Sequence, residues 1–286
     1  MAVEARLVVK GPARDLAQRL VKGRYRLRSL LGRGGMGLVW LAEDEVLRRP
    51  VALKELAPRR PLSEELRMEA HTRAVTEARA TARVDHTGVV RVYDLIDDGN
   101  LPWIVMELLS GRTLKDAVAA EGPLPVKEVA RLGILLLDAL QAVHRAGVVH
   151  RDVKPSNVYL CDDDRVVLGD FGIAWTAGDG STVPDGEFAG SPAYVSPERV
   201  RSEEVGPASD LFSLGSTLYA AVEGRLAFDK GSLFDTLAAV LHNPPAPFLR
   251  AGPLRPIIEG LLVKDPERRL SGDAARTALR AVQHQL

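Results

Sequence analysis

Short runs in which apolar and polar residues alternate dominate the first third of the chain and predict β-strands. The runs cover residues 25–31, 38–42, 51–54, 89–95 and 103–106. Residues 63–84 break this alternation, because they are rich in Glu, Arg and Ala, a composition typical of a helix. A shorter amphipathic helix is predicted over residues 12–22, in an N-terminal extension that carries no recognisable chemistry.

Helical periodicity replaces alternation in the rest of the chain. Apolar residues recur three or four positions apart at Val129, Leu132, Leu136, Leu140 and Val143. They predict a buried helix over residues 126–146, and Gly147 suits its C-terminal cap. Helices are also predicted over residues 113–120 and from Ser209 onward, and a short strand at residues 148–149.

The composition limits the classes of protein that the chain can belong to. It has 286 residues, of which 46% are apolar, enough for one large domain or two packed lobes. Lys+Arg and Asp+Glu balance at 38 each, so no overall charge favours nucleic acid or an anionic membrane. The single cysteine, Cys161, excludes an intrachain disulfide and a cysteine-based metal cluster and fits a reducing cytosol.

The longest apolar stretch, residues 132–140, is interrupted by Asp138 and is far shorter than the roughly 20 residues of a membrane span. The N-terminus lacks the apolar core of a signal peptide. We therefore expect a cytoplasmic protein that has no membrane span and does not bind nucleic acid.

A glycine-rich segment joins the first two predicted strands, with the sequence Gly32-Arg33-Gly34-Gly35-Met36-Gly37. Glycine permits positive φ and lets backbone N–H groups approach phosphate oxygens. By composition alone, a flexible hairpin turn explains the segment equally well. Its place between two strands argues against a dinucleotide-binding Rossmann unit, and the sequence contains no P-loop motif.

The third predicted strand contains Val51-Ala52-Leu53-Lys54. Strand alternation places Ala52 and Lys54 on the same face. A small side chain at Ala52 leaves room for a flat base, and the ammonium of Lys54 can reach phosphates. Taken alone, the run is better explained by a strand with a surface lysine.

Two further motifs supply groups suited to phosphoryl transfer. The segment His150-Arg151-Asp152-Val153-Lys154-Pro155-Ser156-Asn157 is followed by Asp170-Phe171-Gly172. One carboxylate can accept a hydroxyl proton, while the amide oxygen and the other carboxylate can bind hard cations. The lysine can neutralise phosphate. Each residue alone has a simpler explanation, such as an Asx turn or a helix cap.

The ordered set of motifs resembles the protein kinases, and in particular the eukaryotic-like serine/threonine kinases of bacteria. The form Lys154-Pro155-Ser156-Asn157 resembles serine/threonine rather than tyrosine kinases. The resemblance implies an α+β bilobal fold, with an antiparallel sheet and one helix in the N-lobe and a mainly helical C-lobe. It divides the chain into an extension (1–23), an N-lobe (24–108) and a C-lobe (109–286), with ATP bound between the lobes.

Roles for individual residues follow from this resemblance. Asp152 is expected to act as the catalytic base or orienting acceptor, Lys154 to neutralise the γ-phosphate, and Lys54 to hold the phosphates. Asn157 and Asp170 are expected to coordinate Mg²⁺, with Mn²⁺ as an alternative. The nucleotide-binding residues implied are Leu31, Gly32, Arg33, Gly34, Gly35, Met36, Gly37, Val39, Ala52, Lys54, Met106, Glu107 and Leu109. Met106 would guard the deep end of the pocket, and the backbone of Glu107 and Leu109 would pair with adenine.

Supporting and regulatory residues are implied in the same way. Glu77, or failing that Glu69, would pair with Lys54; Asp210 would anchor the catalytic loop; and Arg269 would pair with Glu198. Arg151 would receive a phosphorylated activation-loop residue, expected at Thr182 or Ser181 and less favourably at Thr176. Ser196 departs from the family, which has alanine there, and Ser191 replaces the commoner threonine.

The resemblance also implies partners: ATP, protein substrates with Ser or Thr, and a second copy of the chain during autophosphorylation. Two alternatives stay open, a pseudokinase scaffold and a small-molecule kinase of related fold. The presence of Lys54, Asp152, Asn157 and Asp170 disfavours the first, and the Glu198 and Arg269 features disfavour the second. The chain would be either a freestanding enzyme or an excised kinase domain.

Overall fold

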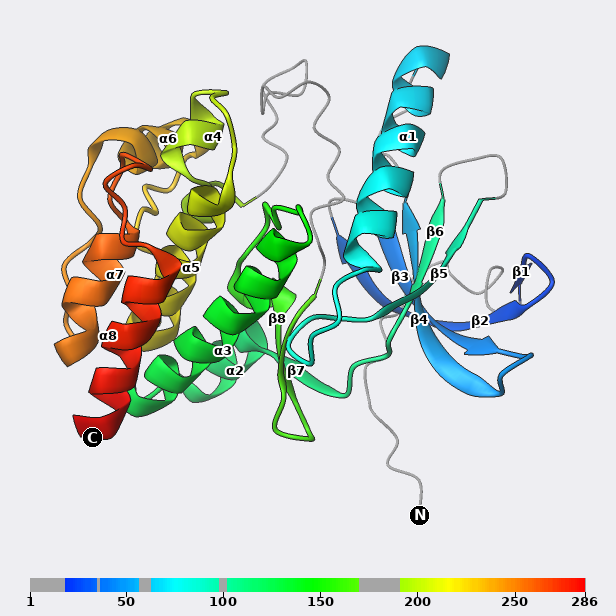
Figure 1. The fold of residues 1–286 in the computed structure, drawn as a ribbon, viewed down its shortest axis with the longest axis horizontal. Coiled ribbons are helices and arrows are strands. Elements are labelled where there is room, and N and C mark those ends of the chain that lie inside the picture. Colours follow the sequence, from blue (N-terminus) through cyan, green and yellow to red (C-terminus); the bar gives the residue numbers. More distant parts are fainter. Residues whose placement is uncertain (1–18, 35–36, 57–62, 98–101, 170–190, 286) are drawn as a thin grey trace. The chain divides into compact units, whose positions relative to one another are not determined.

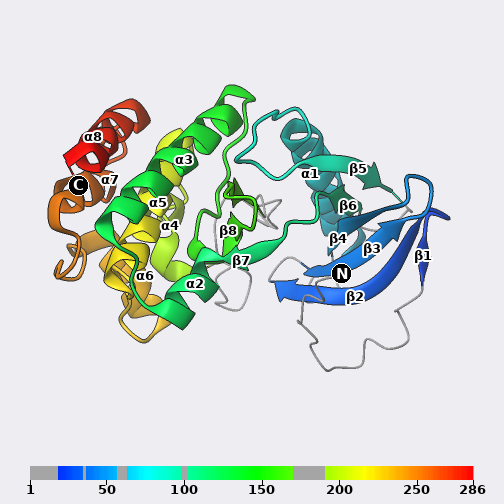
Figure 2. The ribbon, with the colours of Figure 1, turned by 90° about the horizontal axis from the view of Figure 1, so that it is seen from below.

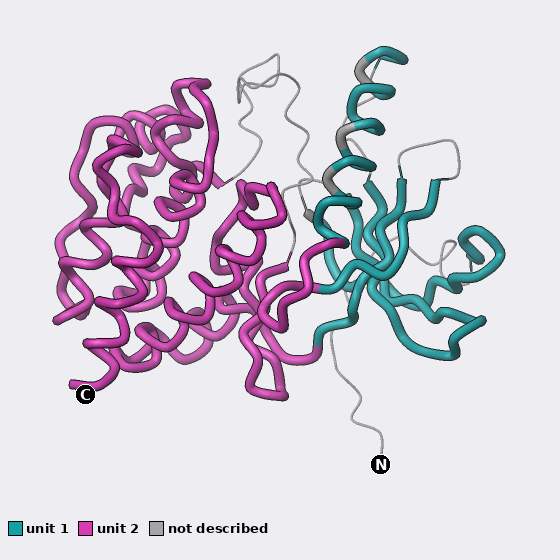
Figure 3. Tube along the Cα trace, in the orientation of Figure 1, with its two compact units in different colours: residues 1–82, 91–109, 173–175 teal, residues 83–90, 110–172, 176–286 magenta. Residues whose placement is uncertain are grey.

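The computed structural model of the chain describes residues 19–34, 37–56, 63–97, 102–169 and 191–285. Within these ranges, the side chains of Leu66, Arg73 and Glu77 are outside the description. The described chain divides into two compact units, coloured separately in Figure 3. Unit 1 holds residues 19–82 and 91–109, and unit 2 holds residues 83–90 and 110–285.

Unit 1 is a six-stranded sheet with one helix (Figure 1). The strands are β1 (Leu20–Val21), β2 (Tyr25–Gly34), β3 (Gly37–Asp44), β4 (Arg49–Leu56), β5 (Val92–Ile96) and β6 (Trp103–Met106), and the helix is α1 (Glu64–Thr81). The strand order is β1-β2-β3-β4-β6-β5, and neighbouring strands pair antiparallel. The α1 helix lies beside β5.

One face of the unit 1 sheet carries its hydrophobic core. Trp40 and Val51 lie there, 1% and 0% exposed, together with Leu53 and Val105. These residues alternate with residues that point to the other face, as the period of two along a strand requires. Figure 2 shows β2 and β3 curving as a pair, a bend that accompanies register shifts between Leu27 and Ser29 and between Leu30 and Gly32.

The helix predicted over residues 12–22 is wrong at its C-terminal end. Residues 12–18 are outside the described ranges, but Leu20–Val21 forms strand β1, paired with β2. Lys22 and Gly23 both adopt positive φ, 51° and 67°. This two-residue reversal matches the right-handed twist of paired strands and favours a hairpin over a continuing helix.

Unit 2 is mainly helical. Its α-helices are α2 (Leu114–Glu121), α3 (Val126–Arg145), α4 (Pro197–Val200), α5 (Pro207–Glu223), α6 (Leu233–His242), α7 (Arg255–Leu261) and α8 (Gly272–Gln285). Short 3-10 turns occur at Pro155–Asn157, Pro192–Tyr194 and Gly252–Leu254. The prediction for residues 126–146 is confirmed by α3, and Gly147 after it adopts φ +75°.

The α5 helix is the centre of the unit 2 core. It packs against α3 on one side and α7 on another, with α8 against α3 (Figure 1). Two glycines permit these close approaches. A Cβ atom at Gly133 of α3 would lie 2.8 Å from a methyl carbon of Leu279, and one at Gly215 of α5 would lie 2.8 Å from Cβ of Leu261. The predicted α+β class, with a sheet-rich and a helical part, is confirmed.

A small sheet in unit 2 flanks the loop that carries the catalytic motif. It has the order β7 (Gly111–Thr113), β8 (Val158–Cys161) and β9 (Val166–Leu168). The short strand predicted at residues 148–149 is wrong, since residues 148–153 have no regular secondary structure. Val148 instead ends the α3 cap, where its N–H donates to the carbonyl of Val143. Residues 148–154 therefore form an irregular loop after α3, and the 3-10 turn Pro155–Asn157 connects this loop to β8.

Candidate active site

Strand register gathers four of the predicted nucleotide-binding residues on one face of the unit 1 sheet. Lys54 of β4 pairs with Val39 of β3, and Ala52 of β4 pairs with Met106 of β6. Directly paired residues in antiparallel strands point to the same face. Val39, Ala52, Lys54 and Met106 therefore share the face opposite the Trp40 core.

Lys54 is 5% exposed, although it carries an ammonium group. A buried charge is costly unless polar groups compensate it, so this lysine is not an ordinary surface residue of a strand. The predicted partner Glu77 lies in α1, but its side chain is outside the described part of the chain. Glu69, the second choice, is exposed on the same helix. The pairing of Glu77 with Lys54 stays a prediction.

The glycine-rich segment forms the end of the β2–β3 hairpin. Gly34 pairs with Gly37, and Gly35 and Met36 between them are outside the described residues. Gly37 adopts φ +139°, a conformation that L-residues rarely adopt. A Cβ atom built on Gly32 meets nothing within 4 Å, so packing in this unit does not demand glycine there.

The segment after β6 contains Glu107 and Leu109, whose backbone groups were predicted to pair with adenine. The N–H of Glu107 donates to the carbonyl of Arg91 at 2.9 Å. The backbone N–H of Glu107 is therefore engaged within unit 1, and its backbone carbonyl is the group whose chemistry suits the amino group of adenine. Leu109 is the last residue of unit 1, and the neighbouring Ser110 already belongs to unit 2.

Two predicted catalytic residues, Asp152 and Lys154, and the predicted metal ligand Asn157 meet in unit 2. The Asp152 carboxylate accepts from Lys154 Nζ at 2.8 Å and from Asn157 Nδ2 at 2.9 Å, both at Oδ2. Asn157 Nδ2 also donates to the backbone carbonyl of Asp152 at 2.8 Å. The side chains of Asp152 and Lys154 are 14% and 17% exposed, so the group is shielded but reachable.

These contacts orient the side-chain amide of Asn157. Because its amide nitrogen donates twice to Asp152, its carbonyl oxygen Oδ1 is turned away from that residue. Amide and carboxylate oxygens are the ligands that Mg²⁺ prefers. The Asn157 orientation therefore fits the predicted metal site. The second predicted ligand, Asp170, is outside the described residues.

A buried carboxylate from the central helix holds the catalytic loop. Asp210, 0% exposed, accepts from the N–H groups of His150 and Arg151, each at 2.8 Å. His144 Nε2 lies 2.7 Å from the same carboxylate. His150 is also fully buried, with Nε2 3.1 Å from the carbonyl of Gly169, which suits a packing role rather than that of a base.

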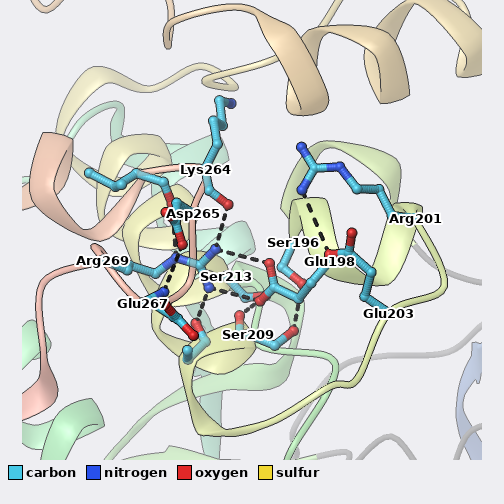
Figure 4. Close-up of polar contacts among 12 residues, drawn as sticks. Ser196, Glu198, Arg201, Glu203, Ser209, Ser213, Lys264, Asp265, Glu267 and Arg269 are labelled. Carbon is cyan, nitrogen blue, oxygen red and sulfur yellow. Dashed lines mark hydrogen bonds and ion pairs between the residues drawn. The ribbon is translucent and has the colours of Figure 1, made fainter.

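Glu198 and Arg269 form a two-pronged ion pair inside unit 2 (Figure 4). Nη1 of Arg269 lies 2.8 Å from Oε1 of Glu198, and Nη2 lies 2.9 Å from Oε2. Their side chains are 3% and 0% exposed. Arg269 also donates to three backbone carbonyls, those of Val263, Lys264 and Ala208. This pair fixes α4 to the segment before α8.

The serine at position 196, where the resembled family has alanine, is explained by its local contacts. Its hydroxyl lies 2.6 Å from that of Ser209 on α5, and both residues are buried (Figure 4). One turn further along α5, Ser213 donates to the carbonyl of Tyr194 at 2.8 Å. Hydroxyl groups of α5 thus hold the segment that enters α4.

Several predicted residues cannot be placed, and some contacts were not expected. Thr176, Ser181 and Thr182 are outside the described residues, like Asp170, Gly35 and Met36. The sequence reasoning missed the His144 contact with Asp210. It also missed Arg199, whose Nη1 donates to the backbone carbonyl of Arg151. Neither residue belongs to a local motif that would have revealed it.

Comparison with known proteins identifies the class. A family model described as "Protein kinase domain" matches residues 25–286, so the chain belongs to the protein kinase domain family. The sheet-rich unit 1 and helical unit 2 are the α+β bilobal fold of that family.

Individual relatives are serine/threonine-protein kinases of bacteria. The chain is 38% identical to PknL of Mycobacterium tuberculosis over 222 residues, 78% of this chain and 55% of the relative. It is 35% identical to PknA of the same organism over 271 residues, 92% of this chain and 62% of the relative. It is 37% identical to the probable serine/threonine-protein kinase SCO3848 of Streptomyces coelicolor over 279 residues, 92% of this chain and 40% of the relative. The chain thus spans about half the length of the curated relatives it matches.

Across the described ranges, no helix is both long and apolar enough to cross a bilayer.

Proposed function

We propose that the chain is an ATP-dependent serine/threonine protein kinase of bacterial signalling, which transfers the γ-phosphoryl group to hydroxyl groups of proteins. One observation carries the proposal. The Asp152 carboxylate is held by Lys154 and Asn157, on a loop whose backbone is anchored by the buried Asp210. Phosphoryl transfer depends mainly on such positioning and charge stabilisation.

In this proposal Asp152 accepts the proton of the attacking hydroxyl and orients its oxygen toward the γ-phosphorus. Lys154, 2.8 Å from Asp152, is close enough to place its charge beside the transferred group. Asn157 and Asp170 would hold Mg²⁺, with Mn²⁺ as the alternative ion, and the bound ion would neutralise charge on the phosphates. The chain's own residues supply alignment and the acceptor for the proton.

The nucleotide half of the site is assigned to the N-lobe, residues 24–108. Val39, Ala52 and Met106 would surround the base, and Lys54 on the same sheet face would hold the phosphates. Residues 109–286 form the proposed C-lobe with the catalytic loop.

Regulation is proposed to involve the segment before α4. Autophosphorylation at Thr182 or Ser181, or in third place Thr176, would supply a phosphate for Arg151. A transient homodimer would carry out this reaction in trans. A cytoplasmic location is proposed because ATP is the phosphoryl donor.

The test is transfer of γ-labelled phosphate from ATP to a generic basic protein and to the chain itself. We expect incorporation on Ser and Thr with the wild type, and its loss with Asp152→Asn and with Lys54→Met. The matched control is Asp163→Asn, at an exposed carboxylate that pairs with Arg165 at 2.7 Å. Absence of transfer by the wild type, or undiminished transfer by Asp152→Asn, contradicts the proposal.

A further inference from the structure

Arg199 is a partly buried cation beside the catalytic loop. It lies in the short α4 helix, directly after Glu198. Burial lowers the pKa of its guanidinium below the usual value of arginine, while the nearby carboxylates of Asp152 and Asp210 act in the opposite direction. Because burying a guanidinium is costly, the contacts that it makes should compensate that cost.

One hydrogen bond of Arg199 goes to the peptide group that precedes Asp152. Its Nη1 donates to the backbone carbonyl of Arg151, the carbonyl joined directly to the nitrogen of Asp152. Arg151 adopts φ +64°, a left-handed conformation that is unfavourable for a non-glycine residue. Such a conformation persists only where the surroundings hold it.

Arg151 is held from both sides by different elements. Its N–H donates to Asp210 Oδ1 of α5 at 2.8 Å, and its C=O accepts from Arg199 of α4. With both peptide groups fixed, the direction in which the next residue leaves the loop is also fixed. That residue is Asp152, whose own N–H reaches His150 Nδ1 at 3.3 Å.

The position of Arg199 itself is secured independently of this contact. Glu198 beside it is locked by Arg269, and Ser196 at the N-cap of α4 pairs with Ser209. Removing the Arg199 guanidinium should therefore leave α4 in place. What it should release is the peptide between Arg151 and Asp152.

We propose that Arg199 is a positioning residue for Asp152, acting through the Arg151 carbonyl, and that it links α4 to the catalytic loop. This rests on the proposed function, since the carboxylate that it positions is the proposed acceptor of the hydroxyl proton. The guanidinium also places a second positive charge near Asp152, in addition to that of Lys154.

The experiment compares Arg199→Gln and Arg199→Lys with the wild type. The matched control is Arg201→Gln, two residues later, where the side chain is 39% exposed and lies 3.7 Å from Glu203. We expect Arg199→Gln to lower kcat by about 10–100-fold, the scale expected when a reacting group is misplaced by about 1 Å. The KM for ATP should stay within about threefold of the wild-type value, because Arg199 is not among the proposed nucleotide-binding residues. Arg199→Lys should recover part of the lost kcat.

Hydrogen–deuterium exchange supplies a readout that does not depend on activity. In Arg199→Gln, amides of residues 148–157 should exchange faster, while those of α5 keep their wild-type rates. The inference is overturned if kcat matches that of Arg201→Gln, or if exchange in residues 148–157 is unchanged. A wild type without transfer activity refutes the proposed function instead, and the exchange experiment still decides whether Arg199 holds the loop.

Discussion

The ion pair between Glu198 and Arg269 offers a quantitative test of how α4 is held. Both side chains are almost fully buried, and the guanidinium makes two bonds to the carboxylate and three to backbone carbonyls. Removing one partner of a buried pair costs about 3–5 kcal/mol, because it leaves the other charge uncompensated. We expect Glu198→Gln to lie near the lower end of this range, at about 3 kcal/mol.

Arg269→Met should cost more, about 5 kcal/mol, because three carbonyls lose a donor in addition to the carboxylate. In the double variant, the loss should be smaller than the sum of the two single losses by about 2 kcal/mol. Such a coupling is expected for residues in direct contact.

The assay is urea unfolding followed by far-ultraviolet circular dichroism. Circular dichroism suits unit 2 because the helices are concentrated there, whereas the described tryptophans, Trp40 and Trp103, lie in unit 1. With a urea slope of about 3 kcal/mol/M, a loss of 3 kcal/mol lowers the midpoint by about 1 M.

The control for this experiment is Glu259→Gln. Its partner Arg255 lies at 2.9 Å, but the two side chains are 43% and 60% exposed, so we expect a loss below about 0.5 kcal/mol. If Glu198→Gln destabilises unit 2 no more than Glu259→Gln does, the reasoning from burial is refuted.

Three further predictions concern other buried polar groups. Ser196→Ala should cost about 1–2 kcal/mol by stranding the Ser209 hydroxyl, and a double alanine variant should cost less than the sum, measured by urea unfolding; additive losses would contradict this. Burial lowers the pKa of Lys264 from 10.5 to about 7, and the charges of Arg269 and Arg201 act in the same direction. Between these two pH values the unfolded state therefore binds more protons than the folded state. Wild-type stability should therefore gain a contribution as pH rises from about 7 to 10, and Lys264→Met should reduce that slope; an unchanged slope would contradict the assignment. Hydrogen bonds from Arg24, and to a smaller extent from backbone N–H groups, lower the pKa of Asp44 from its ordinary 3.8 to about 2. The stabilisation of the fold by Asp44 is therefore complete above about pH 4 and is lost as the pH falls toward 2. Arg24→Met should move acid unfolding of unit 1, followed by tryptophan fluorescence, to higher pH; an unmoved midpoint would show that the pair does not act this way.

Local patterns were sufficient for much of the fold and for part of the site. Alternation placed Ala52 and Lys54 on one face, and the strand register confirms this and adds Val39 and Met106. Helical spacing predicted α3 to within one residue. These signals are local, because each depends on periodicity within a single element.

Other features depend on residues far apart in sequence. The contact between Arg199 and Arg151 joins residues 48 positions apart, and the contact between His144 and Asp210 joins residues 66 positions apart. No local sequence pattern predicts either contact. The error at Leu20–Val21 has a different cause. The turn at Lys22 and Gly23 competes with the helical spacing of the preceding apolar residues, and pairing with β2 decides the outcome.

The central claim is that Asp152 serves the transfer step and not the binding of ATP. Its most direct test is single-turnover transfer with enzyme in excess over ATP, with ATP affinity measured on the same wild-type and Asp152→Asn samples. We predict an ATP dissociation constant within about threefold of the wild type and a transfer rate lower by about 10²–10⁴-fold, the usual contribution of a positioned base. Equal transfer rates, or a loss of transfer that is fully explained by lost ATP binding, would contradict the account.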